Sequence, residues 1–231
     1  GSVTALTYGY FILQVPETLI GTAIATALLP TLSSLVTKHK NEFAQLFTNS
    51  IRAITALSLF TTAVAAITLP GLLNLAFDFS PSQTHLLVWT SRAFLAGLLV
   101  HILLEVLVRA YYARQQPLAP LYATAIRTVI FTLLGITLYR PTGVVGIAAI
   151  DSFSVAVEAI ILLVLLRKFI IRKLEVASTL ARSLVGSIAT IVVSLWIFSL
   201  PLPPIIQIFI SAVITAILFF LFARKEAKLL L

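Results

Sequence analysis

The sequence has no cysteine and no methionine, and only 10% of its residues are charged. Without cysteine, disulfide bonds, thiolate nucleophiles and cysteine-ligated metal sites are excluded. Soluble domains carry about 25% charged residues, so the scarcity of charge argues against a soluble globular enzyme and against a disordered chain. The missing methionine predicts that the chain as written is processed or is a piece of something longer.

Motifs of catalysis are also lacking. The sequence contains no HExxH, no glycine-rich phosphate loop and no GxSxG. Its three histidines, at positions 39, 85 and 101, stand in unrelated places, so no metal site is expected. We therefore expect a protein that is not an enzyme, holds no cofactor, and binds or moves its substrate.

Long apolar runs dominate what is present. The chain is 60% hydrophobic with a mean hydropathy of +1.09, and a membrane-spanning helix needs about 20 apolar residues. The runs bounded by charge, proline and glycine cover residues 4–35, 50–77, 85–113, 119–139, 143–166, 180–200 and 204–223. They are too long for membrane strands. We predict an all-α membrane protein, a bundle of seven transmembrane helices whose short loops make neighbours antiparallel.

The basic residues predict the orientation of this bundle. One set of loops and ends holds Lys38, Lys40, Arg52, Arg114, Arg167, Lys168, Arg172, Lys173, Arg182, Arg224, Lys225 and Lys228. The opposite set holds only Arg140, together with Asp78. The positive-inside rule places the basic set in the cytoplasm, the N-terminus outside and the C-terminus inside. The net charge of +8 then indicates contact with anionic membrane lipids rather than with nucleic acid.

Ionisable residues within the spans are the candidates for function, because such residues are costly in a membrane and usually face a bundle interior or a cavity. They are Glu17, Arg92, His101, Glu105, Arg109, Arg127, Asp151 and Glu158. Gln14 and Pro16 join them as candidate residues of a substrate pathway. A proline inside a helical run kinks it, and the freed carbonyl needs a partner or a water-lined cavity.

Spacing groups these candidates. His101, Glu105 and Arg109 are four residues apart and share a helix face, so Glu105 and Arg109 can pair. At about 1.5 Å per residue, Glu105, Arg127 and Glu158 each lie roughly 12 Å from the cytoplasmic end of their span and could form one polar cluster. Two of the remaining candidates, Arg92 and Asp151, lie nearer the outer side.

Each of these groups can also serve only the stability of the bundle. The Glu105–Arg109 and Arg127–Glu158 pairs can be ion pairs that only hold helices together. His101 can make an interhelical hydrogen bond or take part in a proton relay, and Arg92 can extend its side chain toward the outer surface. The stretch from Ser183 to Ala223 has no charged side chain, so these spans face lipid or hold an apolar ligand.

Several segments resemble the MurJ (MviN) lipid II flippase family. They are residues 1–8 (GSVTALTY), 14–16 (QVP), 21–33 (GTAIATALLPTLS), 105–115 (EVLVRAYYARQ) followed by Pro120, and the 143–146 turn leading into 147–149 (IAA). The resemblance implies the C-terminal lobe of a fourteen-helix transporter of the MATE-like exporter superfamily in the bacterial plasma membrane. By resemblance, its partners are the undecaprenyl-linked peptidoglycan precursor, the N-terminal half of the same transporter and membrane lipids.

The same resemblance divides the chain into three parts. Residues 1–166 are a five-helix part of the lobe, 167–179 a basic cytoplasmic loop, and 180–231 two terminal apolar helices with a possible lipid-tail groove. The sequence also departs from the family. A cavity-facing Arg of the first helix is replaced by Phe11, three residues before Gln14. At the sodium ligands of some members stand Phe131, Gly135 and Asp151, so that site is not carried over.

Three functions stay open from the sequence. The first is a lipid II flippase working by alternating access, in which Arg92, Arg109 and Arg127 attract the anionic head group. The second is an exporter of another lipid-linked oligosaccharide or of a cationic drug, for which Glu17 and the other glutamates leave room. The third is a non-transporting membrane scaffold of the cell-wall machinery.

Overall fold

The computed structural model describes residues 1–38, 40–167 and 176–223, and within these ranges every regular element is a helix. The elements are α1 (Ser2–Pro16), the π-helical segment η1 (Glu17–Thr22), α2 (Ala23–Lys38), α3 (Lys40–Ala76), α4 (Pro81–Ala96), α5 (Leu98–Ala113), α6 (Leu118–Arg167), α7 (Ala177–Phe198) and α8 (Pro204–Phe222). The predicted all-α class is confirmed. Of the predicted basic loop 167–179, residues 168–175 lie outside the described part.

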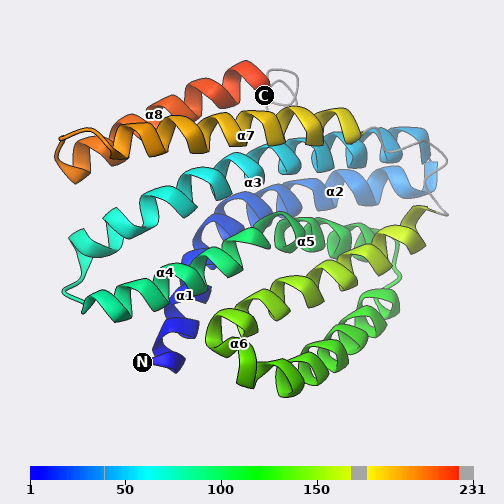
Figure 1. The fold of residues 1–231 in the computed structure, drawn as a ribbon. Coiled ribbons are helices and arrows are strands. Elements are labelled where there is room, and N and C mark those ends of the chain that lie inside the picture. The colour runs from blue at the N-terminus through cyan, green and yellow to red at the C-terminus, as the bar shows by residue number, and fades with distance from the viewer. Residues whose placement is uncertain (39, 168–175, 224–231) are drawn as a thin grey trace.

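The seven predicted spans are recovered once two bends are taken into account. Five stretches are long and apolar enough to cross a membrane, and α4 and α5 together form a sixth that bends by 43°. Helix α6 has 50 residues, about 75 Å if straight, against a hydrocarbon core of about 30 Å. It reverses at Gly143, whose φ of 61° is a conformation that favours glycine, and Figure 1 shows its two arms folding back on each other.

Helix α3 begins about ten residues earlier than the predicted span at 50–77. The added turns carry Phe43 and Phe47, which are fully buried in the main hydrophobic core. This burial extends the helix beyond the apolar run that hydropathy detects, because tertiary packing stabilises an amphipathic end.

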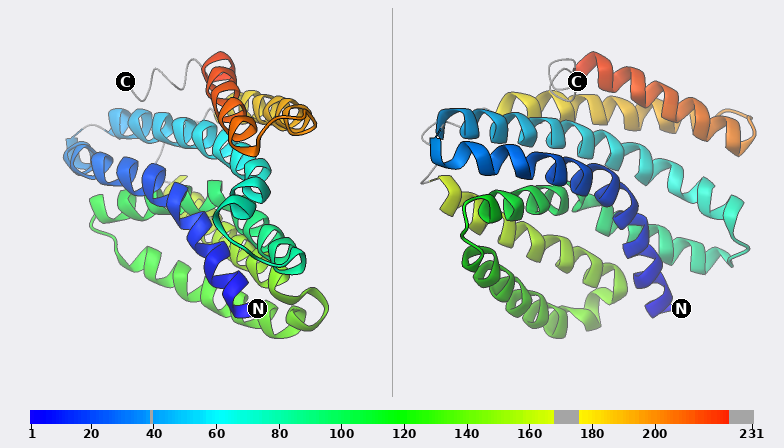
Figure 2. Two further views of the ribbon diagram at one scale, coloured as in Figure 1. Left: turned by 90° about the vertical axis from the view of Figure 1, so that its left-hand side faces the viewer. Right: turned by 180° about the vertical axis from the view of Figure 1, so that it is seen from behind.

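The helices form two packed groups that share α3 (Figures 1 and 2). Helices α7 and α8 pack against each other and against α3 at one edge of the lobe. On the other side of α3, α5 packs against α2, α3, η1 and α6, while α4 packs against α1 and α6. The beginnings of α3 and α7 and the ends of α5 and α6 lie at one end of the lobe (Figure 1). Lys40, Arg114, Arg167 and Arg182, which stand at or near these helix ends, therefore share a side, as predicted.

The main core surrounds α5. Leu98, Ile102, Val106 and Leu107 are fully buried there against residues of α2, α3 and α6. The Tyr111 hydroxyl donates a hydrogen bond of 2.8 Å to the Leu162 carbonyl oxygen, which ties α5 to the second arm of α6. A polar side chain on the buried face of α5 must therefore find its partners among the neighbouring helices.

Candidate functional site

The centre of the site is His101 on α5, whose side chain is only 5% exposed. Its Nδ1 atom lies 3.5 Å from Glu17 Oε1, at the start of η1. Its Nε2 atom lies 3.4 Å from Asp151 Oδ2, on the second arm of α6. One imidazole ring thus stands between carboxylates from two other parts of the fold.

Arg127 extends this cluster along α6. Its Nη2 atom lies 3.1 Å from Asp151 Oδ1, and its Nη1 atom lies 3.5 Å from Glu158 Oε2. The Thr124 hydroxyl donates a hydrogen bond of 2.5 Å to Glu158 Oε1. We call His101, Glu17, Asp151, Arg127 and Glu158 the ionic cluster; it contains three carboxylates and one guanidinium.

The reversal at Gly143 explains why these residues meet. Arg127 precedes Gly143 by almost as many residues as Glu158 follows it, so the two arms of the hairpin place them opposite each other. Thr124 and Arg127 are three residues apart on one arm, and Asp151 and Glu158 are seven apart on the other, so each pair shares a face. Burial of a carboxylate such as Glu158, 1% exposed, is costly unless the group is paired and hydrogen-bonded.

A second close approach brings α6 against α5. Gly97 separates α4 from α5, and a Cβ atom built there would lie 2.3 Å from the Ser152 Oγ atom. Ser152 donates a hydrogen bond of 3.2 Å to the Ala93 carbonyl oxygen at this bend. Glycine is therefore required for Ser152, and with it the adjacent Asp151, to lie against α5. Sequence reasoning missed both Gly97 and Ser152, since neither carries charge.

The backbone next to Glu17 is irregular. Pro16 ends α1 and has no amide hydrogen, and the six residues after it form the π-helical segment η1. Such π-helical segments often occur at functional sites. Glu17, the first residue of η1, is held by His101, whereas Gln14 lies exposed on α1. The predicted kink at Pro16 thus takes the form of a local change of helix type.

Glu105 and Arg109 form the ion pair that their spacing predicts, with 3.7 Å between Glu105 Oε2 and Arg109 Nη2. They are 38% and 31% exposed. The expectation that Glu105 would join Arg127 and Glu158 is wrong, because Glu105 lies on the half-exposed side of α5 and contacts Arg109 instead. The place in the cluster that was expected for Glu105 is taken by Asp151.

Arg92 is separate from the ionic cluster. Its Nε atom donates a hydrogen bond of 2.9 Å to the Ala66 carbonyl oxygen on α3. Pro70 lacks the amide hydrogen that would normally bond this carbonyl four residues earlier. The Arg92 guanidinium also lies 5.4 Å from the Trp89 ring centroid, beside a cavity between α3 and α4. Arg92 therefore completes the hydrogen bonding of a proline-containing helix.

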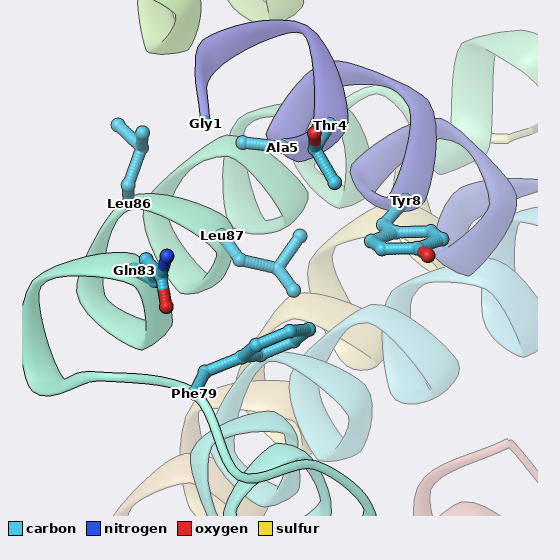
Figure 3. Close-up of a pocket in the computed structure, with 8 residues that line it drawn as sticks. All are labelled: Gly1, Thr4, Ala5, Tyr8, Phe79, Gln83, Leu86 and Leu87. Carbon is cyan, nitrogen blue, oxygen red and sulfur yellow. The ribbon is translucent and has the colours of Figure 1, made fainter.

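A cavity at the start of α1 contains none of the predicted site residues. It is lined by Tyr8 on α1, Phe79 in the loop before α4, and Gln83 and Leu87 on α4, with further small and apolar neighbours. Figure 3 shows Leu87 projecting between the Tyr8 and Phe79 rings. Apart from the Tyr8 phenol, no ionisable side chain among the described residues lines this cavity.

Helices α7 and α8 bury small polar side chains and expose apolar ones. On α7 the buried face carries Ser183, Ser187, Thr190 and Ser194, and on α8 it carries Gln207, Ser211 and Thr215. Large apolar residues such as Trp196 and Phe209 are more than 60% exposed on the outside. This arrangement suits helices that face lipid, because polar groups turn toward neighbouring helices.

A bundle of apolar spans with ionic groups gathered between the helices defines a multi-pass helical membrane protein. The family model described as "Lipid II flippase MurJ" matches residues 1–215. The chain belongs to this family.

Individual relatives agree with the family assignment. The chain is 32% identical over 158 residues to a "Probable lipid II flippase MurJ" of Vibrio cholerae, covering 67% of this chain and 30% of that protein. It is 28% identical over 166 residues to a protein of the same name from Rhizobium meliloti, covering 70% of this chain and 31% of that protein. The matched part thus spans about a third of the length of these relatives.

A solved structure has the same fold. "Lipid II flippase MurJ, inward closed conformation" superposes with a TM-score of 0.81 at 17% sequence identity. The match covers 97% of this chain and 48% of that chain. The predicted resemblance to one half of such a protein is confirmed at the level of the fold.

Proposed function

We propose that this chain is the C-terminal lobe of a lipid II flippase in the bacterial plasma membrane. With an N-terminal lobe it carries the undecaprenyl-linked peptidoglycan precursor from the inner to the outer leaflet by alternating access. The observation that carries the proposal is the family match over residues 1–215 combined with a fold that covers 48% of a MurJ structure. The proposed role is transport without covalent chemistry.

The three candidate arginines differ in how available their guanidinium groups are to the anionic head group of the precursor. Arg92 is bound to the Ala66 carbonyl oxygen, whereas Arg109 and Arg127 are 31% and 29% exposed. Arginine side chains bind phosphate groups through several donors at once. The contact between Arg109 and Glu105 is long, at 3.7 Å, so a diphosphate can replace the glutamate there. We therefore assign head-group attraction chiefly to Arg109 and Arg127.

The remaining candidates of the pathway fall on α1, η1, α5 and α6. Gln14 is exposed and Pro16 immediately precedes the irregular segment, whereas Glu17, His101, Asp151 and Glu158 lie in the ionic cluster. We assign Gln14 a surface role in the pathway and Pro16 the role of setting the helix bend.

The apolar pair α7 and α8 is the proposed site for the hydrocarbon tail. Its outward faces carry no charge between Ser183 and Ala223, which suits a lipid chain lying along them. The basic helix ends at one side support the orientation with the N-terminus of the chain outside and its C-terminus in the cytoplasm.

The test is transport of the precursor in cells that depend on the full-length protein. R109Q should reduce transport strongly while leaving protein levels unchanged, because the ion-pair partner of Arg109 among the described residues is the half-exposed Glu105. R140Q, at the opposite end of the lobe, is the matched control and should transport normally. Normal transport by both R109Q and the R109Q/R127Q double variant would show that these cations do not serve the substrate.

One observation favours a second candidate function. The ionic cluster has three carboxylates against one guanidinium, and a net acidic site suits a cationic solute. Export of a cationic compound predicts that such compounds, and not the precursor, raise the thermal stability of the purified protein.

A further inference from the structure

The two ring nitrogens of His101 each face a carboxylate oxygen. The distances are 3.5 Å from Nδ1 to Glu17 Oε1 and 3.4 Å from Nε2 to Asp151 Oδ2. A neutral imidazole has one N–H donor and one acceptor nitrogen, so it can donate to only one of these carboxylates. An imidazolium has two donors and can serve both. The geometry around His101 therefore matches its protonated form.

The charges around His101 also favour a bound proton. Glu17, Asp151 and Glu158 carry three negative charges against one positive charge on Arg127, and a proton on His101 would reduce the excess from two to one. His101 Nε2 and Asp151 Oδ2 are both buried without a hydrogen bond of good geometry to any described residue. A small movement of either side chain would make that bond once Nε2 carries a proton.

The other elements around α5 do not change this balance. The Tyr10 phenol on α1 lies within electrostatic range of Glu17 and Asp151. Residues 23–35 of α2 and 53–76 of α3 contain no ionisable side chain. Among the remaining charges, Arg92 on α4 bonds the Ala66 carbonyl oxygen, and Glu105 and Arg109 on α5 pair with each other.

We propose that His101 is an exchangeable proton-binding site that fastens η1 to α6 when the proton is bound. On loss of the proton the neutral ring keeps one carboxylate and releases the other. Nδ1 faces Glu17, whose ionic partner among the described residues is His101, whereas Nε2 lacks a hydrogen bond and Asp151 is also held by Arg127, so the contact to Asp151 is the one lost. Because Glu17 begins the π-helical segment after Pro16, loss of its link to α6 through His101 frees the bend between α1 and α2 to change.

This inference concerns the same cluster as the proposed function, yet it requires no lipid substrate. Failure of precursor transport would leave it intact, and its own failure would leave the family function intact. The two measurements below are therefore made on the purified chain in lipid nanodiscs.

The first measurement is nitrogen NMR of the chain with labelled histidine, with His101 assigned by comparing H39Q and H85Q variants. Near about pH 6 both ring nitrogens should have imidazolium shifts, and by about pH 9 the ring should be neutral. In an E17Q/D151N double variant the ring should already be neutral near the lower pH. A ring that stays neutral throughout, or one that stays charged to the higher pH, would overturn the proposal.

The second measurement follows the bend itself. The sequence has no cysteine, so S2C and S33C place two spin labels on α1 and α2, on either side of η1. We expect the label–label distance distribution to shift between the two pH values. The shift should be lost in E17Q, H101Q and H101K and kept in H85Q, the matched control on the exposed histidine. No shift while His101 titrates, or a shift that persists in H101Q, would show that the proton does not control the bend.

Discussion

Two parts of the chain, α1 to α6 and α7 to α8, bury polar side chains in different ways. In α1 through α6, charged groups such as Arg127 and Glu158 are brought together at membrane depth and neutralise one another in part. In α7 and α8 the hidden groups are hydroxyls such as Ser187 and Ser211, with apolar side chains outside. The second pattern meets the needs of helices in lipid. The first does more than that, because it retains an excess of negative charge that an ordinary packing role does not require.

The largest effect on the free energy of unfolding is expected from removal of the Arg127 guanidinium. R127A should lower the free energy of unfolding by about 3–5 kcal/mol, because it leaves the buried Glu158 carboxylate without its counterion and removes one of the two ionic partners of Asp151. Unfolding of the purified chain in bicelles measures this change. Addition of E158Q to R127A should restore part of the loss, and R140A, at an exposed site, should change little. Equal stability of R127A and R140A would contradict the assigned role of the cluster.

Removal of the neutral partner of Glu158 should have a smaller effect. T124V keeps the shape of Thr124 but removes the hydroxyl that donates to Glu158 Oε1, and hydrogen bonds to charged groups contribute about 1.5–3 kcal/mol. T128V is the control, since the Thr128 hydroxyl bonds only a carbonyl oxygen of its own helix. The same unfolding measurement should separate the two variants, and an equal loss in both would count against a special Thr124–Glu158 contact.

In the uncharged region the largest effect should come from packing. A Cβ atom at Gly186 on α7 would lie 2.4 Å from the Phe60 ring on α3, so G186A must displace that ring. We expect a cost of about 1–3 kcal/mol, typical of overpacked cores. The comparison is G135A, where the added Cβ meets only an Ile147 methyl at 3.8 Å. A loss in G135A as large as in G186A would show that close approach of α3 and α7 is not the cause.

The smallest effect is expected from the hydroxyls of α7. Ser187 and Ser194 are buried, and their Oγ atoms have no hydrogen-bond partner within the described part of the chain. S187A and S194A should be neutral or should stabilise the chain by up to about 1 kcal/mol, because each removes a buried polar group that is unsatisfied. A clear loss of stability in either variant would show that its hydroxyl makes a stabilising hydrogen bond, as Thr124 does.

Hydropathy and loop charge were enough to predict the seven spans and their alternating directions. These signals are strong because every span must be apolar over the thickness of the membrane. They could not predict the extension of α3 to Lys40 or the bend at Gly97, which depend on the burial of Phe43 and on the approach of Ser152. Depth counting placed Arg127 beside Glu158 correctly.

The same counting failed for Glu105 and Asp151 because depth along a helix says nothing about which way a side chain faces. Glu105 turns toward Arg109, and Asp151 turns toward His101 and Arg127. Thr124 could have been found as the residue three positions before Arg127 on the same face, but a neutral side chain gave no reason to look. Partners between helices require the tertiary arrangement.

The reversal at Gly143 also has a consequence for how the length of α6 can vary. Each residue turns an α-helix by about 100°, so one residue inserted between Arg127 and the reversal would rotate Arg127 away from the opposite arm. A single deletion would do the same in the other direction. The ion pair therefore constrains the number of residues between Arg127 and Glu158 as well as the identities of the two side chains. Changes of length that the fold tolerates should be confined to the loops outside the hairpin.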